Sequence, residues 1–99
     1  MEKVYDVKNL KIDASVIHFE LGGESVIVSL LQSGSRRLPQ ATIDQLQHFE
    51  LSYSGIGIHW PLLDEDLAIA GLLHAAGKDH LIVQSISSLY LDQPVVAVA

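Results

Sequence analysis

Residues 55–67 read Gly55-Ile56-Gly57-Ile58-His59-Trp60-Pro61-Leu62-Leu63-Asp64-Glu65-Asp66-Leu67 and combine a strand pattern, a stop and an acidic block. Apolar residues alternate up to Trp60, which predicts a half-buried strand, and Pro61 ends it because proline cannot continue a central strand. An apolar patch spaced for one face of a short helix follows the acids. We therefore expect Asp64, Glu65 and Asp66 to lie just ahead of a helix, where the helix dipole favours negative charge.

A hairpin is expected to contain this strand. Residues 49–53 alternate as well, and Ser54-Gly55 separates the two alternating runs. Gly57 has no side chain to pack, so we expect it to mark a bulge or the close approach of another element.

The first half of the chain predicts an antiparallel sheet. Residues 16–21 alternate, and residues 24–31 form a return strand after the tight turn that Gly22-Gly23 provides. The return strand is apolar enough to predict a central place in the sheet, and residues 4–12 predict a further strand. The residues expected to share the apolar faces of the hairpin are Ile17, Phe19, Leu21, Val26, Val28 and Leu30.

A short helix is expected over residues 43–48. Thr42 and Gln45 have the spacing of a capping box, in which each side chain binds the other residue's backbone N–H. The helix should present Ile43 and Leu46 to the core.

Together these patterns predict a single α+β domain over residues 4–76, with a small antiparallel sheet of about five strands and two or three short helices. Residues 77–99 are expected to form a C-terminal extension that packs on the domain or on a neighbouring subunit. The periodicity of residues 79–90 fits either a helix or a strand. The apolar residues 95–99 are expected to pair with a sheet edge.

A family resemblance rests on His59-Trp60-Pro61 and Asp64-Glu65-Asp66-Leu67, supported upstream by Arg37-Leu38 and Ala41-Thr42. Over residues 4–74 the chain resembles the bacterial family catalogued as domain of unknown function 2442. The resemblance implies a small α+β domain with an antiparallel sheet. Genes of that family often lie beside a second small domain of unknown function, which implies a toxin–antitoxin-like pair.

The chain departs from that family in two places. Ala68 occupies a position where the family pattern suggests a serine able to cap the following helix. The segment after Gly77 does not have the pattern of the helix-turn-helix domain that sometimes follows this domain, which removes the simplest route to DNA binding.

The composition excludes some kinds of site and indicates which cellular compartment to expect. The chain has no cysteine, so disulfides, cysteine-based zinc sites and thiol catalysis are excluded. Residues 1–6 carry acids and no apolar run, so we expect no signal peptide, and no apolar run is long enough to span a membrane. We expect a soluble, cytoplasmic protein.

Charge is distributed unevenly along the chain. The formal net charge is −6, and residues 38–77 contain no lysine or arginine. An acidic surface favours a basic protein partner, although a solvated surface that maintains solubility is the simpler explanation. Binding of nucleic acid is disfavoured because it needs clustered cations to displace counterions. In the alternative hypothesis, in which the protein does bind nucleic acid, the patch that faces the phosphates would consist of Lys3, Lys8, Lys11, Arg36 and Arg37.

Candidate chemistry concentrates on the same acidic block. His59, Asp64 and Asp66 are types that bind divalent ions, but no second histidine at helical spacing completes a shell. No nucleophile with its base and no phosphate loop appears, so no cofactor is expected. Trp60 is expected to be a core anchor, with a ligand-stacking wall as the alternative.

Three functional hypotheses follow. The preferred one is a noncatalytic protein-interaction or regulatory module, with an antitoxin-like role as one case, a basic protein as partner and self-association expected. The second is a small metal-binding protein or enzyme that uses His59 and the acidic block, and the third is the nucleic-acid regulator described above. If a binding site exists, its candidate residues are His59, Trp60, Asp64, Glu65 and Asp66.

Overall fold

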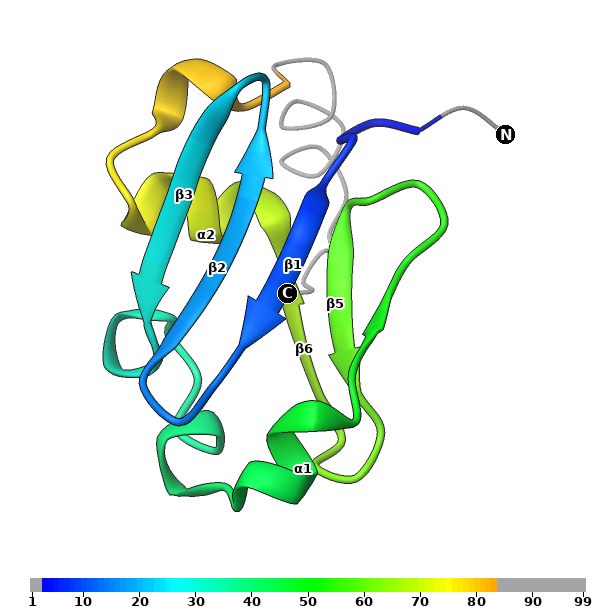
Figure 1. Ribbon diagram of the computed structural model, residues 1–99, viewed down its shortest axis with the longest axis vertical. Helices are drawn as coiled ribbons and strands as arrows, with labels where there is room; N and C mark the ends of the chain where they lie inside the picture. Colours follow the sequence, from blue (N-terminus) through cyan, green and yellow to red (C-terminus); the bar gives the residue numbers. More distant parts are fainter. Residues whose placement is uncertain (1–2, 84–99) are drawn as a thin grey trace, which may run out of the picture.

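The computed structural model describes residues 3–83, which fold into two three-stranded antiparallel sheets with two α-helices and three 3-10 helices. The α+β class is therefore confirmed, with the strands divided between two sheets. The elements are β1 Lys8–Ile12, β2 Val16–Leu21, β3 Glu24–Ser29, η1 Leu30–Gln32, η2 Leu38–Gln40, α1 Ile43–Gln47, β4 Glu50–Leu51, β5 Gly57–Trp60, β6 Glu65–Ala68, α2 Ile69–Ala75 and η3 Asp79–Leu81. Figure 1 shows the first sheet in front, α2 behind β2 and β3, and α1 at one end.

The first sheet has the strand order β1-β2-β3. Gly22 and Gly23 both have positive φ and join β2 to β3 through a two-residue turn, as the sequence predicts. The alternating residues that were expected to face the core are all buried.

The prediction that the return strand is central is wrong for the sheet formed by residues 3–83, because β2 occupies its middle and β3 lies at its edge. The strand also ends earlier than expected. After Ser29 the chain enters η1, and the hydroxyl of Ser29 caps it by accepting a hydrogen bond from the backbone N–H of Gln32.

The strand expected over residues 4–12 is present only as β1. Its pairing with β2 is irregular between Lys8 and Lys11, where Asn9 takes a positive φ of 54°. This bulge shortens the regular part of the strand.

Helix α1 begins with the predicted capping box. The backbone N–H of Gln45 donates to the Thr42 hydroxyl, and the backbone N–H of Thr42 donates to the Gln45 side chain. Leu46 is buried, but Ile43 is 54% exposed, so its predicted inward orientation is wrong. A helix of five residues is little more than one turn and presents only a narrow stripe to the core.

The second sheet has the order β4-β5-β6, and its first two strands form the predicted hairpin. The acids precede helix α2 in the sequence as expected, but Glu65 and Asp66 belong to strand β6, and the helix begins only at Ile69. A tight turn, with the Leu63 N–H donating to the Trp60 carbonyl and Asp64 at φ 51°, reverses the chain so that β6 pairs with β5. Helix α2 follows directly, without a side-chain cap from Ala68.

Trp60 lies at the centre of the core. Its side chain is fully buried, and its indole N–H donates to the Leu46 carbonyl at 3.2 Å, which joins β5 to α1. Its predicted role as a core anchor is confirmed. The side chains of both sheets, of α1 and of α2 contribute to the same core cluster.

Residues 78–83 pack against the hairpin of the first sheet. Glu24 binds both Lys78 and His80, at 3.0 and 2.9 Å, and Leu81 lies beside Gly22. The backbone N–H of Val83 donates to the Tyr5 hydroxyl at 2.9 Å. The predictions for residues 84–90 and for residues 95–99 lie outside the described residues. No helix within residues 3–83 is long and apolar enough to cross a membrane.

Candidate functional site

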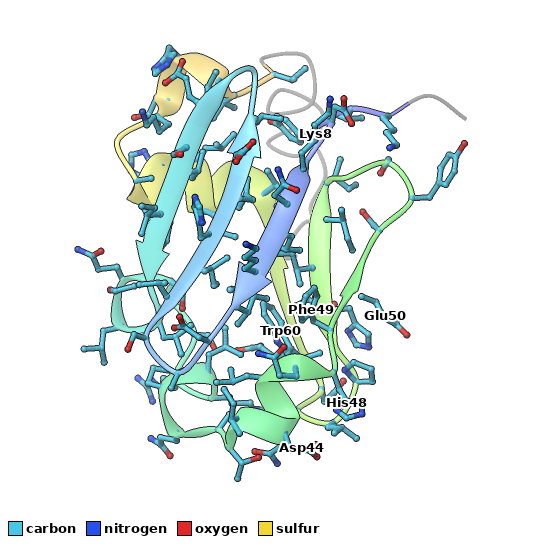
Figure 2. The ribbon with its side chains drawn as sticks, viewed as in Figure 1. Lys8, Asp44, His48, Phe49, Glu50 and Trp60 are labelled. Carbon is cyan, nitrogen blue, oxygen red and sulfur yellow. The ribbon has the colours of Figure 1, made fainter. Side chains whose placement is uncertain are left out.

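An acidic row crosses the exposed face of the second sheet. Strand register places Glu50 of β4 opposite His59 of β5, and His59 opposite Asp66 of β6. Side chains of directly opposed residues lie on the same face of an antiparallel sheet. We call these three residues the acidic face, and Figure 2 shows Glu50 beside the lower end of the sheet, near His48.

The acidic face is open to solvent. The side chain of His59 is 40% exposed and that of Asp66 is 75% exposed. The neighbouring pair on the same face consists of Gly57 and Ala68, so no large side chain stands next to the row on that side. Small residues therefore flank His59 and Asp66 on that side.

His59 and Asp66 form the tightest contact in the row. His59 Nδ1 lies 2.7 Å from Asp66 Oδ1, a distance typical of a charge-assisted hydrogen bond. When Nδ1 donates, Nε2 of the same ring can accept from a partner or, after protonation, donate. The pair orients the imidazole and leaves its other nitrogen available.

Glu65 faces the other side of the sheet and has a structural role. Its Oε2 accepts from the Ser35 hydroxyl, and Ser35 is buried. The same hydroxyl oxygen accepts from the backbone N–H groups of Arg37 and Leu38. These bonds attach the loop before η2 to the start of β6.

Asp64 also contributes mainly through its backbone. Arg37 Nη1 donates to the carbonyl oxygens of Leu63 and Asp64, at 2.5 and 3.1 Å, which ties the β5–β6 turn to the same loop. Within residues 3–83, no group of three or more histidine, aspartate or glutamate side chains is placed to hold a metal ion. Of the residues proposed to bind a metal ion, the structure brings only His59 and Asp66 into contact.

Trp60 is directed into the core, opposite Glu65 and away from His59. Its burial excludes it as the wall of a surface site. The five candidate residues therefore separate into an exposed pair, His59 and Asp66, and three residues with structural positions. Glu50 was missed as a site residue, although pairing residues 49–53 with 56–60 across the turn places it opposite His59.

Some of the basic residues proposed to bind nucleic acid already contact other groups of the described chain. Lys3 and Lys8 each lie 3.7 Å from a carboxylate oxygen of Asp6. The guanidinium of Arg37 is bound to backbone carbonyls, as described above. Lys11 and Arg36 are exposed.

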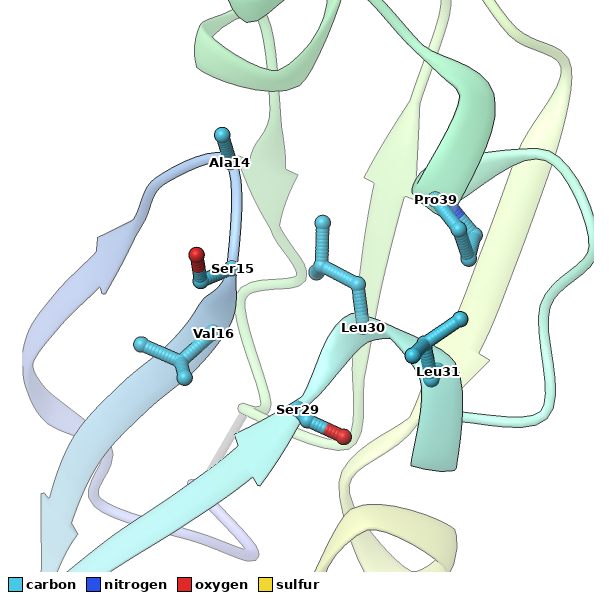
Figure 3. A pocket seen from close by; sticks show the side chains of 7 residues that line it. All are labelled: Ala14, Ser15, Val16, Ser29, Leu30, Leu31 and Pro39. Carbon is cyan, nitrogen blue, oxygen red and sulfur yellow. The ribbon is translucent and has the colours of Figure 1, made fainter.

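A hollow of about 440 Å³ lies where β2 begins and β3 ends, near η1 and η2 (Figure 3). It was not expected from the sequence. None of the side chains that line it titrates near neutral pH, so it offers no acid or base for catalysis. Its lining residues are Ala14, Ser15, Val16, Ser29, Leu30, Leu31 and Pro39.

Comparison with known proteins gives one result. The model of a family described as "Protein of unknown function (DUF2442)" matches residues 7–78. No match was found among curated proteins or among solved structures.

Proposed function

Because the chain belongs to the DUF2442 family of proteins of unknown function, no activity follows from its membership, and we propose a role from its surface. The chain is a noncatalytic interaction module, and its acidic face docks a basic segment of another protein. The observation that carries this proposal is the alignment of Glu50, His59 and Asp66 across three neighbouring strands on an exposed sheet face.

The local charge supports a basic partner. Residues 38–77, which form this sheet and both α-helices, contain five carboxylates and no lysine or arginine. Glu65 is bound to Ser35, so the carboxylates directed outward from the sheet are those of Glu50 and Asp66. A cation that approaches this face meets no fixed positive side chain from that part of the chain.

The spacing of the row suggests what the partner presents. Neighbouring strands lie about 4.8 Å apart, so the outer carboxylates are separated by roughly 10 Å across three strands. Two arginine or lysine side chains at that separation would each meet one carboxylate. Positions i and i+7 of a helix, separated by about 10.5 Å, have this spacing.

An antitoxin-like role is one case of this function. The partner would then be the basic product of a neighbouring gene, in line with the paired-gene habit of the family that the sequence resembles. Charge complementarity of this kind increases association rates and makes binding sensitive to salt.

The test is recovery of a partner from the host with the tagged full chain. We expect a basic protein to co-elute, to be released by salt, and to be lost with the double variant Glu50→Lys/Asp66→Lys. The control is Glu20→Lys, which reverses an acid on the first sheet and should leave the complex intact. Recovery of the chain alone, or equal loss with the control, would contradict the proposal.

A further inference from the structure

We propose that two copies of the chain associate through β3, whose open edges pair antiparallel about a two-fold axis at Ile27. The two β1-β2-β3 sheets then form one continuous sheet. This inference is independent of the proposed function, because the acidic face lies on the other sheet.

The four edge strands within residues 3–83 differ in how well they are protected. β1 carries a bulge and two lysines, and β4 has only two residues. β6 has only four residues and begins with two acids, and Ser35 and Arg37 bind its first residue and the turn before it. β3 has six residues in regular register and contains no proline, lysine or arginine, so it lacks the usual protection of an edge.

The direction of the backbone groups can be derived from one hydrogen bond. The Asp13 N–H donates to the Val16 carbonyl, so the backbone groups of Val16 are directed toward β1. Successive residues alternate in an antiparallel strand, so Ile17 is directed toward β3 and pairs with Val28. By the same alternation, Ser25 and Ile27 direct their N–H and C=O groups to the open edge, where no described strand pairs with them, and Ser29 directs its N–H the same way while its carbonyl belongs to the first turn of η1.

The residues of β3 are compatible with pairing to a second copy. With Ile27 on the two-fold axis, Ile27 lies opposite its own counterpart, and Ser25 lies opposite Ser29 of the second copy. Both are residues with outward backbone groups, and opposed residues share a face as a continuous sheet requires. No two charged residues are opposed, because Glu24 would lie opposite Leu30 and is already bound by Lys78 and His80.

An exposed apolar residue of this region supports the same occupant. Ile27 is 57% exposed at the centre of the edge. A two-fold axis at this residue brings the exposed Ile27 side chains of both copies together, which a single pairing strand from an unrelated protein does not do. The self-complementary register therefore favours a second copy over another protein.

Sedimentation equilibrium of the full chain tests the proposal. We expect a reversible dimer that Ile27→Lys weakens by about tenfold or more, since two like charges would face each other at the axis. Leu62→Lys is the matched control, because Leu62 is 55% exposed but lies in the turn of the other sheet. A monomer at every concentration, or equal weakening by both variants, would overturn the proposal.

Cysteine cross-linking tests the register. The natural chain has no cysteine, so an introduced thiol can only link to its counterpart. Opposed Cα atoms in a hydrogen-bonded antiparallel pair lie about 5.5 Å apart, which a disulfide spans. We expect Ile27→Cys to form a disulfide-linked dimer, Ser25→Cys alone not to, and Ser25→Cys/Ser29→Cys to do so. Linkage of Ser25→Cys alone without linkage of Ile27→Cys would overturn the register and the proposed axis.

Discussion

Gly55 lies so close to the backbone of Tyr5 that a Cβ atom at position 55 would overlap the Tyr5 carbonyl oxygen. Next to it, the Ser54 carbonyl accepts from the backbone N–H groups of Val4 and Tyr5, at 2.7 and 3.2 Å. The hairpin turn of the second sheet thus holds the N-terminal segment against the domain. The Tyr5 hydroxyl in turn accepts a hydrogen bond from the backbone N–H of Val83, so Tyr5 links both ends of the described chain.

The first prediction concerns this contact. We expect Gly55→Ala to lower the free energy of unfolding by about 2–4 kcal/mol, because φ is +77° and the added methyl group would displace the backbone of Tyr5. Urea denaturation followed by circular dichroism measures the change. Gly71→Ala is the control, since Gly71 lies in α2 with open space around it, and it should stabilise by roughly 0.5–1 kcal/mol. Similar effects of the two variants would contradict the argument.

The second prediction concerns the hydroxyl of Ser35. This buried group donates to Glu65 and accepts from the backbone N–H groups of Arg37 and Leu38. We expect Ser35→Ala to cost about 1–3 kcal/mol of unfolding free energy, because it leaves buried polar groups without partners. Ser54→Ala should change stability by less than about 0.5 kcal/mol, since the Ser54 hydroxyl makes no hydrogen bond among the described residues. A loss with Ser35→Ala no larger than with the control would refute the structural role.

The third prediction concerns acid stability. The pKa of the Glu24 carboxyl lies below its ordinary value of 4.5, first because of the hydrogen bond from His80 and then because of that from Lys78. A depressed pKa in the folded state means that ionised Glu24 stabilises the fold above about pH 4.5 and that this contribution is lost as pH falls through the folded pKa. We expect Glu24→Gln to be less stable than the natural chain near neutral pH and equally stable in strong acid.

Denaturation curves collected across that pH range provide the measurement. Replacing both partners, with Lys78→Gln and His80→Gln together, should remove the same pH-dependent difference. A stability gap between Glu24→Gln and the natural chain that persists unchanged into strong acid would show that the effect does not come from this carboxylate.

The fourth prediction compares how much two adjacent residues, His59 and Trp60, contribute to the free energy of unfolding. We expect His59→Ala to change the unfolding free energy by less than about 1 kcal/mol, because its pair with Asp66 is exposed. Trp60→Ala should cost about 3–5 kcal/mol, because the indole is fully buried. Thermal scans of both variants provide the comparison, and a large loss with His59→Ala would mean that the acidic face also supports the core.

Local patterns predict the faces of strands well. Ile17 and Phe19 are buried as their alternation indicates, and the capping box of Thr42 and Gln45 forms as its spacing indicates. These features depend on residues close in sequence, where steric and hydrogen-bonding preferences act directly. The apolar face of a strand does not reveal which strand lies beside it, so the edge position of β3 was not predictable in this way.

The candidate site was predictable only in part for a related reason. Acids are compatible with the start of a helix, but long-range pairing with β5 places Glu65 and Asp66 in a strand. The two-residue period of that strand then sends Glu65 inward to Ser35 and Asp66 outward to His59. The close approach also falls at Gly55, where the contact is with Tyr5 from the distant N-terminal segment, while Gly57 pairs regularly with Ala68.

Trp60 is the single tryptophan of the chain, and its indole is sealed between β5 and α1 with its nitrogen on the Leu46 carbonyl. Its fluorescence therefore comes from one defined place in the interior. The emission should shift to longer wavelength and become accessible to dissolved quenchers only when the helix separates from the strand. Opening of the core can thus be followed without attaching a dye, and docking at the surface should leave the emission unchanged.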